Sequence, residues 1–288
     1  MSVGMVEVQT MAVDSASTPV HSAPFGSPAV GGPPEEEQIV VTREDLPGAV
    51  SDTNWKVRKE SYNVLRGIIV QAGGGMEPVN NVNSEVILTE LDDLIPSILL
   101  DKNANALDGA LQLALAYSQY CRTATLPAMA EKIAVSLVKG NGFTSPRPSA
   151  PKVAAAVVLK LMEVGADTQS LVAATSVLLE QGLTSRKPKL VQNSSSLLLE
   201  ATYSFGAACL PLAAVASAIP KLLSHSNKKI RDTAMEILAE ICRALGSKAP
   251  MNEVISKMKN AQVKELDTMM QKQPGPTPIK IGLRCKST

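Results

Sequence analysis

The chain has 288 residues, of which 45% are hydrophobic but only 3% aromatic, and its formal net charge is +1. This balance excludes the strong basic excess of a domain that binds nucleic acid nonspecifically over its whole surface. The core must be built from Leu, Ile, Val, Ala and Met, whereas strands prefer β-branched and aromatic residues. We therefore expect an all-α protein.

The two ends of the chain differ in composition from its middle. Residues 1–41 are rich in Ser, Pro, Gly and Val without helical periodicity, which predicts a disordered tail. We expect a helical domain over residues 42–273 and a C-terminal extension over 274–288. No segment approaches the roughly 18 apolar residues of a membrane span, and no secretory signal precedes the domain. We therefore expect a cytoplasmic protein without membrane contact.

The four cysteines are widely spaced and include no CxxC pair. Three of them lie among apolar residues of predicted helices, which is typical of buried, reduced thiols in a cytosolic protein. The cysteines are Cys121, Cys209, Cys242 and Cys285.

Helices are predicted wherever apolar residues recur at positions i, i+3 and i+4. In chain order they cover residues 84–98, 105–117, 126–137, 152–164, 171–178 and 228–245. Ser84 is the predicted cap of the first helix, and Gly182 the predicted stop of the fifth. The clearest helix is the last, because Asn227 precedes it and Gly246 follows its end. Strand signals are nearly absent.

The helices come in pairs, and the junction within each pair repeats one pattern. A polar or proline-containing turn is followed by basic residues and then by an apolar helix. The junctions are residues 52–59, 101–106, 145–153, 185–190 and 226–231. Their first apolar helix residues are spaced roughly 37 to 49 residues apart, which is the period of HEAT and armadillo repeats. We therefore expect an α-solenoid of stacked helix pairs.

Stacking of such pairs brings the five junctions onto one continuous edge. Most of the basic residues in these junctions would then form a cationic ridge on a nearly neutral molecule. Such a ridge orients an acidic partner surface, although turn residues can equally be cationic only because they are solvated. The ridge favours a protein-binding function.

Trp55, the only tryptophan of the chain, lies in the first junction among charged residues. A lone tryptophan is most often a core residue. Its place in a turn immediately before a helix argues instead for exposure, and exposed tryptophan is a typical anchor of a binding surface. Both interpretations stay open from the sequence.

Four segments together resemble the TOG domain of the microtubule polymerases and the CLASP proteins. The resemblance covers residues 42 to about 285 and is closest to the polymerase type. The first segment is Leu46-Pro47 followed by Asn54-Trp55-Lys56-Val57-Arg58, and the second is Asp101-Lys102-Asn103-Ala104 followed by Ala114-Leu115-Ala116-Tyr117. The third is Asn227-Lys228-Lys229-Ile230-Arg231, and the fourth is Gln262-Val263-Lys264-Glu265-Leu266.

The resemblance implies a flat paddle of about six HEAT-type antiparallel helix pairs, whose intra-pair turns bind the curved αβ-tubulin heterodimer. Such a protein acts at microtubule ends, in the cytoplasm or at the spindle or centrosome, and regulates microtubule assembly. By implication Trp55 and Lys56 contact β-tubulin, and Lys228, Lys229 and Arg231 contact α-tubulin. The contacts between them fall to Lys102, Asn103, Lys152, Lys187 and Lys189.

The chain departs from the polymerases in carrying one such domain and no basic lattice-binding segment. Processive polymerisation would therefore require dimerisation or a longer chain. The alternative function is that of a HEAT-type adaptor for another acidic protein, which would use the same ridge.

Motifs for chemistry are missing from the sequence. There is no phosphate-binding G-x-x-x-x-G-K-[ST], no H-E-x-x-H and no G-x-S-x-G. Gly73-Gly74-Gly75 is read as a flexible connection, and neither His21 nor His225 has a cysteine at metal-ligand spacing. We expect no catalysis, no cofactor and no metal.

Overall fold

The computed structural model describes residues 39–73, 91–120, 126–164 and 169–272, and these residues form helices and turns without a strand. The first half contains α1 (Leu46–Ala49), α2 (Trp55–Gly73), α4 (Leu94–Ile98), α5 (Ala104–Tyr120), α6 (Leu126–Lys139) and α7 (Ser149–Val164). The second half contains α8 (Gln169–Val177), α9 (Pro188–Phe205), α10 (Leu212–Leu223), α11 (Lys228–Ala244), α12 (Asn252–Ser256) and α13 (Asn260–Lys272). The all-α prediction is confirmed.

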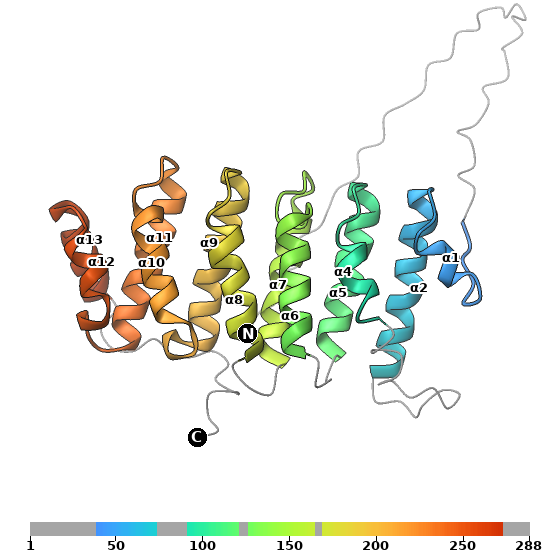
Figure 1. Cartoon of the computed structure of the whole chain (residues 1–288), viewed down its shortest axis with the longest axis horizontal. Helices are drawn as coiled ribbons and strands as arrows, with labels where there is room; N and C mark the ends of the chain where they lie inside the picture. Colours follow the sequence, from blue (N-terminus) through green and yellow to red (C-terminus); the bar gives the residue numbers. More distant parts are fainter. Residues whose placement is uncertain (1–38, 74–90, 121–125, 165–168, 273–288) are drawn as a thin grey trace, which may run out of the picture. The chain divides into compact units, whose positions relative to one another are not determined.

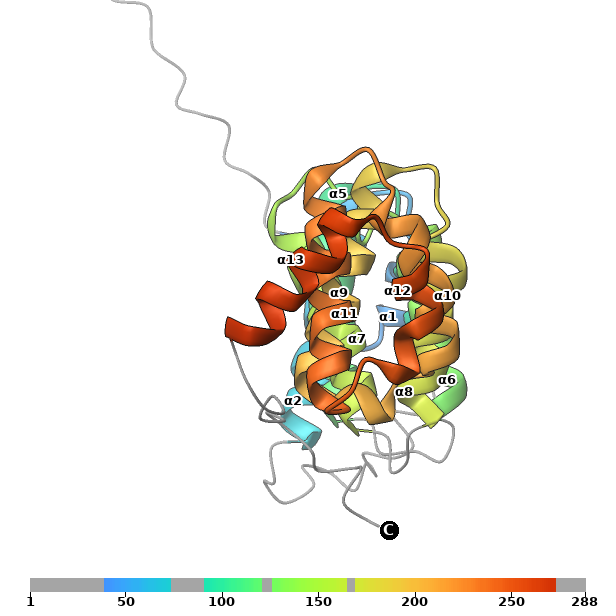
Figure 2. The ribbon, with the colours of Figure 1, turned by 90° about the vertical axis from the view of Figure 1, so that its left-hand side faces the viewer.

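Within residues 39–272 the helices form two layers (Figures 1 and 2). Helices α2, α5, α7, α9, α11 and α13 pack side by side in one layer, and α4, α6, α8, α10 and α12 form the other. Consecutive helices pair across the layers, so the described residues comprise six pairs, from α1/α2 to α12/α13. The predicted α-solenoid of HEAT-type pairs is confirmed.

The hydrophobic core runs between the two layers. Each helix turns its apolar stripe inward, and Leu111, Ile133, Leu198 and Ile237 are fully buried there. Truncating any one of them to alanine should cost about 2–5 kcal/mol, because the transfer free energy is lost and a cavity remains. The helix pairs therefore hold together through leucine, isoleucine and valine rather than through aromatic side chains.

Helix α11 begins and ends where the sequence predicts. The Asn227 side chain accepts a hydrogen bond from the Lys229 N–H at 2.9 Å and caps the first turn. Gly246 takes a φ of 64° just past the end, a left-handed conformation that glycine adopts without steric cost. Both ends of this helix are thus determined by local residues.

The helix predicted to stop at Gly182 departs from regular α geometry before it ends. Residues Leu178–Gly182 form a π-helical turn that continues α8. Gly182 lies against α9, where an added Cβ would come within 2.4 Å of the Ser194 Oγ. Close approach of the two helices therefore requires glycine at this position.

Some predictions lie outside the described residues. They concern the tail over residues 1–38, Ser84 and Ile87, Gly74 and Gly75, Cys121, Cys285, His21 and the extension over 274–288. Among the described residues, no helix has both the length and the apolar character of a membrane span.

The prediction of reduced thiols holds for one of the two described cysteines and fails for the other. Cys242 is buried and free, as expected. Cys209 is disulfide-bonded in this structure, so the prediction is wrong for Cys209. The spacing of cysteines along a chain does not show which of them the fold brings together.

Candidate protein interface

The turns within the helix pairs lie along one edge of the two-layered array, the upper edge in Figure 1. We call this edge the rim. It comprises turns 1 to 6, which are residues 50–54, 99–103, 140–148, 183–187, 224–227 and 257–259. The predicted alignment of turns along one edge is confirmed.

Three of the turns share one construction. A side chain two residues before the capping asparagine accepts the hydrogen bond of the asparagine N–H, at 2.6, 2.8 and 3.0 Å. The asparagine side chain in turn accepts an N–H of the helix that follows, at 3.0, 2.9 and 2.9 Å. The residue pairs are Asp52 and Asn54, Asp101 and Asn103, and His225 and Asn227. The turn backbones are therefore ordered by their own side chains.

Two arginines hold turns 1 and 5 from inside. The Arg58 Nη1 donates to the carbonyl oxygens of Asp52 and Thr53, at 2.7 and 3.1 Å. The Arg231 Nη1 donates to the carbonyl oxygens of His225 and Ser226 in the same way, at 2.7 and 2.8 Å. Each arginine thus stabilises the turn five to six residues before it.

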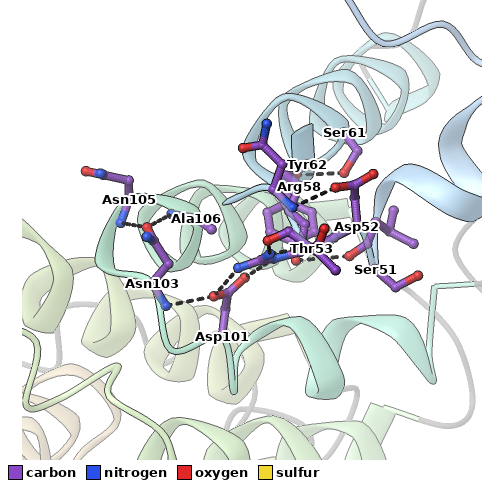
Figure 3. Close-up of polar contacts among 12 residues, drawn as sticks. Ser51, Asp52, Thr53, Arg58, Ser61, Tyr62, Asp101, Asn103, Asn105 and Ala106 are labelled. Carbon is purple, nitrogen blue, oxygen red and sulfur yellow. Dashed lines mark hydrogen bonds and ion pairs between the residues drawn. The ribbon is translucent and has the colours of Figure 1, made fainter. Parts of the chain in front are cut away.

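Arg58 also joins turn 1 to turn 2 (Figure 3). Its Nε and Nη2 bind the two carboxylate oxygens of Asp101 at 2.7 and 2.9 Å. The two side chains are only 18% and 5% exposed, and Tyr62 is buried beneath them. A bidentate pair of this kind fixes orientation as well as distance, so turns 1 and 2 are held as one unit.

The environment of this pair shifts three pKa values. Burial by itself raises the pKa of Asp101, but hydrogen bonds from Arg58 and from the Asn103 N–H outweigh it and lower the pKa below 3.8. The Asp101 hydrogen bond raises the pKa of Arg58. Burial, followed by the charge of Asp101, raises the pKa of Tyr62 to about 12. The pair is therefore ionised at neutral pH.

We expect the stabilisation from Asp101 to fade in acid. Its pKa is lower in the folded than in the unfolded chain, so its contribution is complete above about pH 5 and is lost as the pH falls through the folded value. Urea unfolding of the wild type and Asp101→Asn at pH 7 and near pH 2.5 should show a difference in stability that narrows in acid. An equal difference at both pH values would contradict a role for the charge.

The remaining neighbouring turns are also bridged by polar contacts. Arg147 of turn 3 binds Asn105 of α5 and pairs with Asp108 at 3.7 Å. The Lys189 Nζ donates to the carbonyl oxygens of Thr144 and Ser145 at 3.2 and 2.5 Å, which joins α9 to turn 3. Two further contacts, each of 3.4 Å, are Asn227 to Gln192 and Gln262 to the carbonyl oxygen of Leu223. The rim is thereby preorganised along its length.

All ten predicted contact residues lie on the rim or in the first turns of the helices that leave it. Five of them are exposed lysines with no carboxylate among the described residues within 4.0 Å, and these are Lys56, Lys102, Lys152, Lys187 and Lys229. Lys228 is exposed but pairs with Asp232 at 2.6 Å. The five lysines are the cations best placed to meet a partner.

Three predicted contact residues have structural roles within the rim. Asn103 caps α5, Lys189 bonds to turn 3, and Arg231 holds turn 5. The sequence shows that these polar groups lie at turns, but not that neighbouring backbone groups bind them. Their contact with a partner stays a prediction.

Trp55 is the first residue of α2, and its side chain is partly buried against the main core. The side chain is therefore neither the fully buried core residue nor the fully exposed anchor that the sequence left open. The indole is held in place by packing and still reaches the surface at the end of the rim. A rigid, partly exposed aromatic side chain loses little conformational entropy on binding.

Sequence reasoning missed the residues that organise the rim, above all Arg58, Asp101 and Arg147. A signal was present, since an arginine follows the capping asparagine by four residues in both turn 1 and turn 5. As for metals, no group of three or more His, Cys, Asp or Glu side chains in the described part of the chain is arranged to hold an ion.

Comparisons with known proteins agree on one family. The family model described as XMAP215/Dis1/CLASP, TOG domain, matches residues 45–270. The spindle pole body component alp14 of Schizosaccharomyces pombe is 24% identical over 225 residues, which are 78% of this chain and 26% of that protein. The protein MOR1 of Arabidopsis thaliana is 22% identical over 241 residues, 81% of this chain and 11% of that protein. This chain therefore spans about a quarter or less of the length of these relatives.

Solved structures show the same fold. One, from a study of tubulin recruitment and assembly by microtubule polymerases with TOG domain arrays, has a TM-score of 0.69 at 21% identity and covers 81% of this chain and 47% of that one. The third TOG domain of Drosophila melanogaster Mini spindles has a TM-score of 0.62 at 17% identity and covers 84% of this chain and 100% of that one. With the family model matched over most of the array, the chain belongs to the XMAP215/Dis1/CLASP TOG domain family.

Proposed function

We propose that this chain is a non-enzymatic module that binds the curved αβ-tubulin heterodimer through the rim and regulates microtubule assembly in the cytoplasm. The observation that carries the proposal is the alignment of the turns on one edge, with Trp55 at one end and a basic turn toward the other. Family membership supports it, as does the similarity to a protein named as a spindle pole body component. Residues 42–273 form the proposed binding domain.

The rim has the properties of a binding surface for an acidic partner. Its exposed lysines attract and orient such a partner, and its backbone is already ordered by internal hydrogen bonds, so little entropy is lost on association. The indole at one end and the cations at the other would make contact simultaneously only with a partner of matching curvature. This arrangement allows discrimination between a bent and a straight tubulin dimer.

The direct test is the binding of unpolymerised tubulin to the wild type and to Trp55→Ala. Loss of an aromatic anchor should weaken binding by at least about 2 kcal/mol, or roughly 30-fold. The matched control is Val70→Ala, which truncates an exposed apolar side chain near the far end of the same helix and should change nothing. Size-exclusion chromatography with tubulin, followed by titration, measures both.

Two further measurements complete the test. Thermal unfolding of Trp55→Ala shows whether loss of its packing against the core has unfolded the first repeat. Sedimentation with stabilised microtubules should show that the chain binds them more weakly than it binds free tubulin dimers. Undiminished co-elution of folded Trp55→Ala with tubulin would contradict the proposed contact.

A second candidate function is that of an adaptor for another acidic protein. The partial burial of Trp55 favours it, because an indole that only completes the first repeat needs no partner. Acrylamide quenching of this single tryptophan, with and without an excess of non-fluorescent candidate partner, would report whether the indole becomes covered. Failure of the wild type to co-elute with tubulin dimers would favour the adaptor.

A further inference from the structure

A pocket of about 500 Å³ lies between turns 5 and 6, and we call it the sixth-turn pocket. Its polar lining includes His225, Arg231, Lys257, Lys259 and Gln262, and its apolar lining includes Leu223, Val254 and Met258. None of its lining residues is a carboxylate. Gln262 joins the two sides, because its Nε2 donates to the carbonyl oxygen of Leu223 at 3.4 Å.

Comparison with the pocket between turns 1 and 2 shows how the charge of the sixth-turn pocket differs. There, the Asp101 carboxylate pairs with Arg58 and offsets its charge, and Asp52 is a second acidic residue in the lining of a pocket of about 410 Å³. Arg231 holds turn 5 as Arg58 holds turn 1. The two arginines are therefore equivalent in their repeats, and their surroundings can be compared position by position.

At both positions where the lining of the Arg58 pocket has an acid, the lining of the Arg231 pocket has none. His225 stands where Asp52 stands in turn 1, two residues before the capping asparagine. Lys257 stands three residues before the start of α13, as Asp101 does before α5. Among the described residues no carboxylate lies within 4.0 Å of the Arg231 guanidinium. The fold therefore repeats the arginine but replaces its next-turn acid with a lysine.

We propose that the sixth-turn pocket binds a carboxylate of an acidic peptide segment, which supplies the negative charge that the pocket lining lacks. An arginine beside two lysines is a favourable site for a carboxylate. Lys257 has an exposed partner, Glu253, at 2.8 Å, with a side chain that is 86% exposed. Such an exposed surface pair is weak, so it exchanges readily for a ligand.

The spacing of the cations favours an extended peptide over a single phosphate group. Lys228 and Lys229 begin α11, whereas Lys257 and Lys259 lie in turn 6. Neighbouring helices lie about 8–10 Å apart, and an extended chain advances about 3.3 Å per residue. Glutamates or aspartates about three residues apart would therefore reach both the start of α11 and turn 6. A lone phosphate would reach only one of these two places.

This inference deepens the proposed function, since the acidic segment is expected on the same partner that contacts Trp55, but its test needs no tubulin. A fluorescein-labelled hexaglutamate peptide is titrated with the full chain at about 50 mM salt and followed by anisotropy. Lys257→Gln/Lys259→Gln should weaken binding about 10-fold or more. The control Lys264→Gln/Lys272→Gln removes the same charge from exposed positions on α13 outside the pocket and should change it less than about 2-fold.

The outcomes separate this proposal from the tubulin proposal. Trp55→Ala should keep the wild-type affinity for hexaglutamate, so a loss of tubulin binding alone concerns only the proposed function. Equal weakening of hexaglutamate binding in both lysine variants would show nonspecific charge attraction and overturn the proposed binding in the pocket. The absence of hexaglutamate binding, or binding only of a matched phosphoserine peptide, would overturn the acidic-peptide ligand.

Discussion

Replacing Arg58 with alanine is expected to lower the free energy of unfolding by about 3 kcal/mol. The change leaves the Asp101 carboxylate, whose side chain is 5% exposed, without its bidentate partner, and an unpaired buried charge is strongly destabilising. It also removes the donor that holds the turn 1 carbonyl oxygens. Urea unfolding measures the effect. Arg66→Ala, an exposed arginine on the same helix, should stay within about 0.5 kcal/mol of the wild type.

A double-mutant cycle shows whether the two side chains act together. Arg58→Ala combined with Asp101→Asn should cost less than the sum of the single changes, because the double variant no longer contains a buried unpaired charge. Arg58→Lys keeps the positive charge but not the bidentate geometry and should be intermediate. Strictly additive effects in the cycle would contradict coupling of turns 1 and 2 through this pair.

Gly140→Ala should also be strongly destabilising, at about 2–3 kcal/mol. An alanine Cβ there would lie 2.7 Å from the carbonyl oxygen of Leu99 and 2.8 Å from that of Ser136, so backbone must move. Leu99 immediately follows α4 and Ser136 belongs to α6, so the change pushes neighbouring repeats apart near turns 2 and 3. Differential scanning calorimetry and tubulin titration should show a lower midpoint and weaker binding.

Gly67→Ala is the matched control for this change. Gly67 lies in the middle of α2 with nothing within 4 Å of an added Cβ. The substitution should stabilise the chain by about 0.5–1 kcal/mol, because alanine restricts the unfolded chain and favours the helix. If both glycine variants shifted stability in the same direction, the close approach at Gly140 would not be the cause.

The sequence determined the helices and their order because the signals are local. The apolar residues of α5 and α11 recur with the period of a helix, and Asn227 and Gly246 bound α11 by their own hydrogen bonding and conformational preferences. The repeat period determined the pairing as well. Each two-helix unit buries its apolar face only against its neighbours in the chain, so the turns must align on one edge.

Only the tertiary structure decided what each polar side chain on that edge does. The Asp101 partner of Arg58 is 43 residues away, and the carbonyl oxygens that bind Lys189 are 44 and 45 residues away. A charge pattern places such a residue at a turn, but the distance and angle to the next turn come from how the layers pack. The partial burial of Trp55 and the uncompensated cations of the sixth-turn pocket have the same origin, because burial and charge balance are properties of neighbouring repeats together.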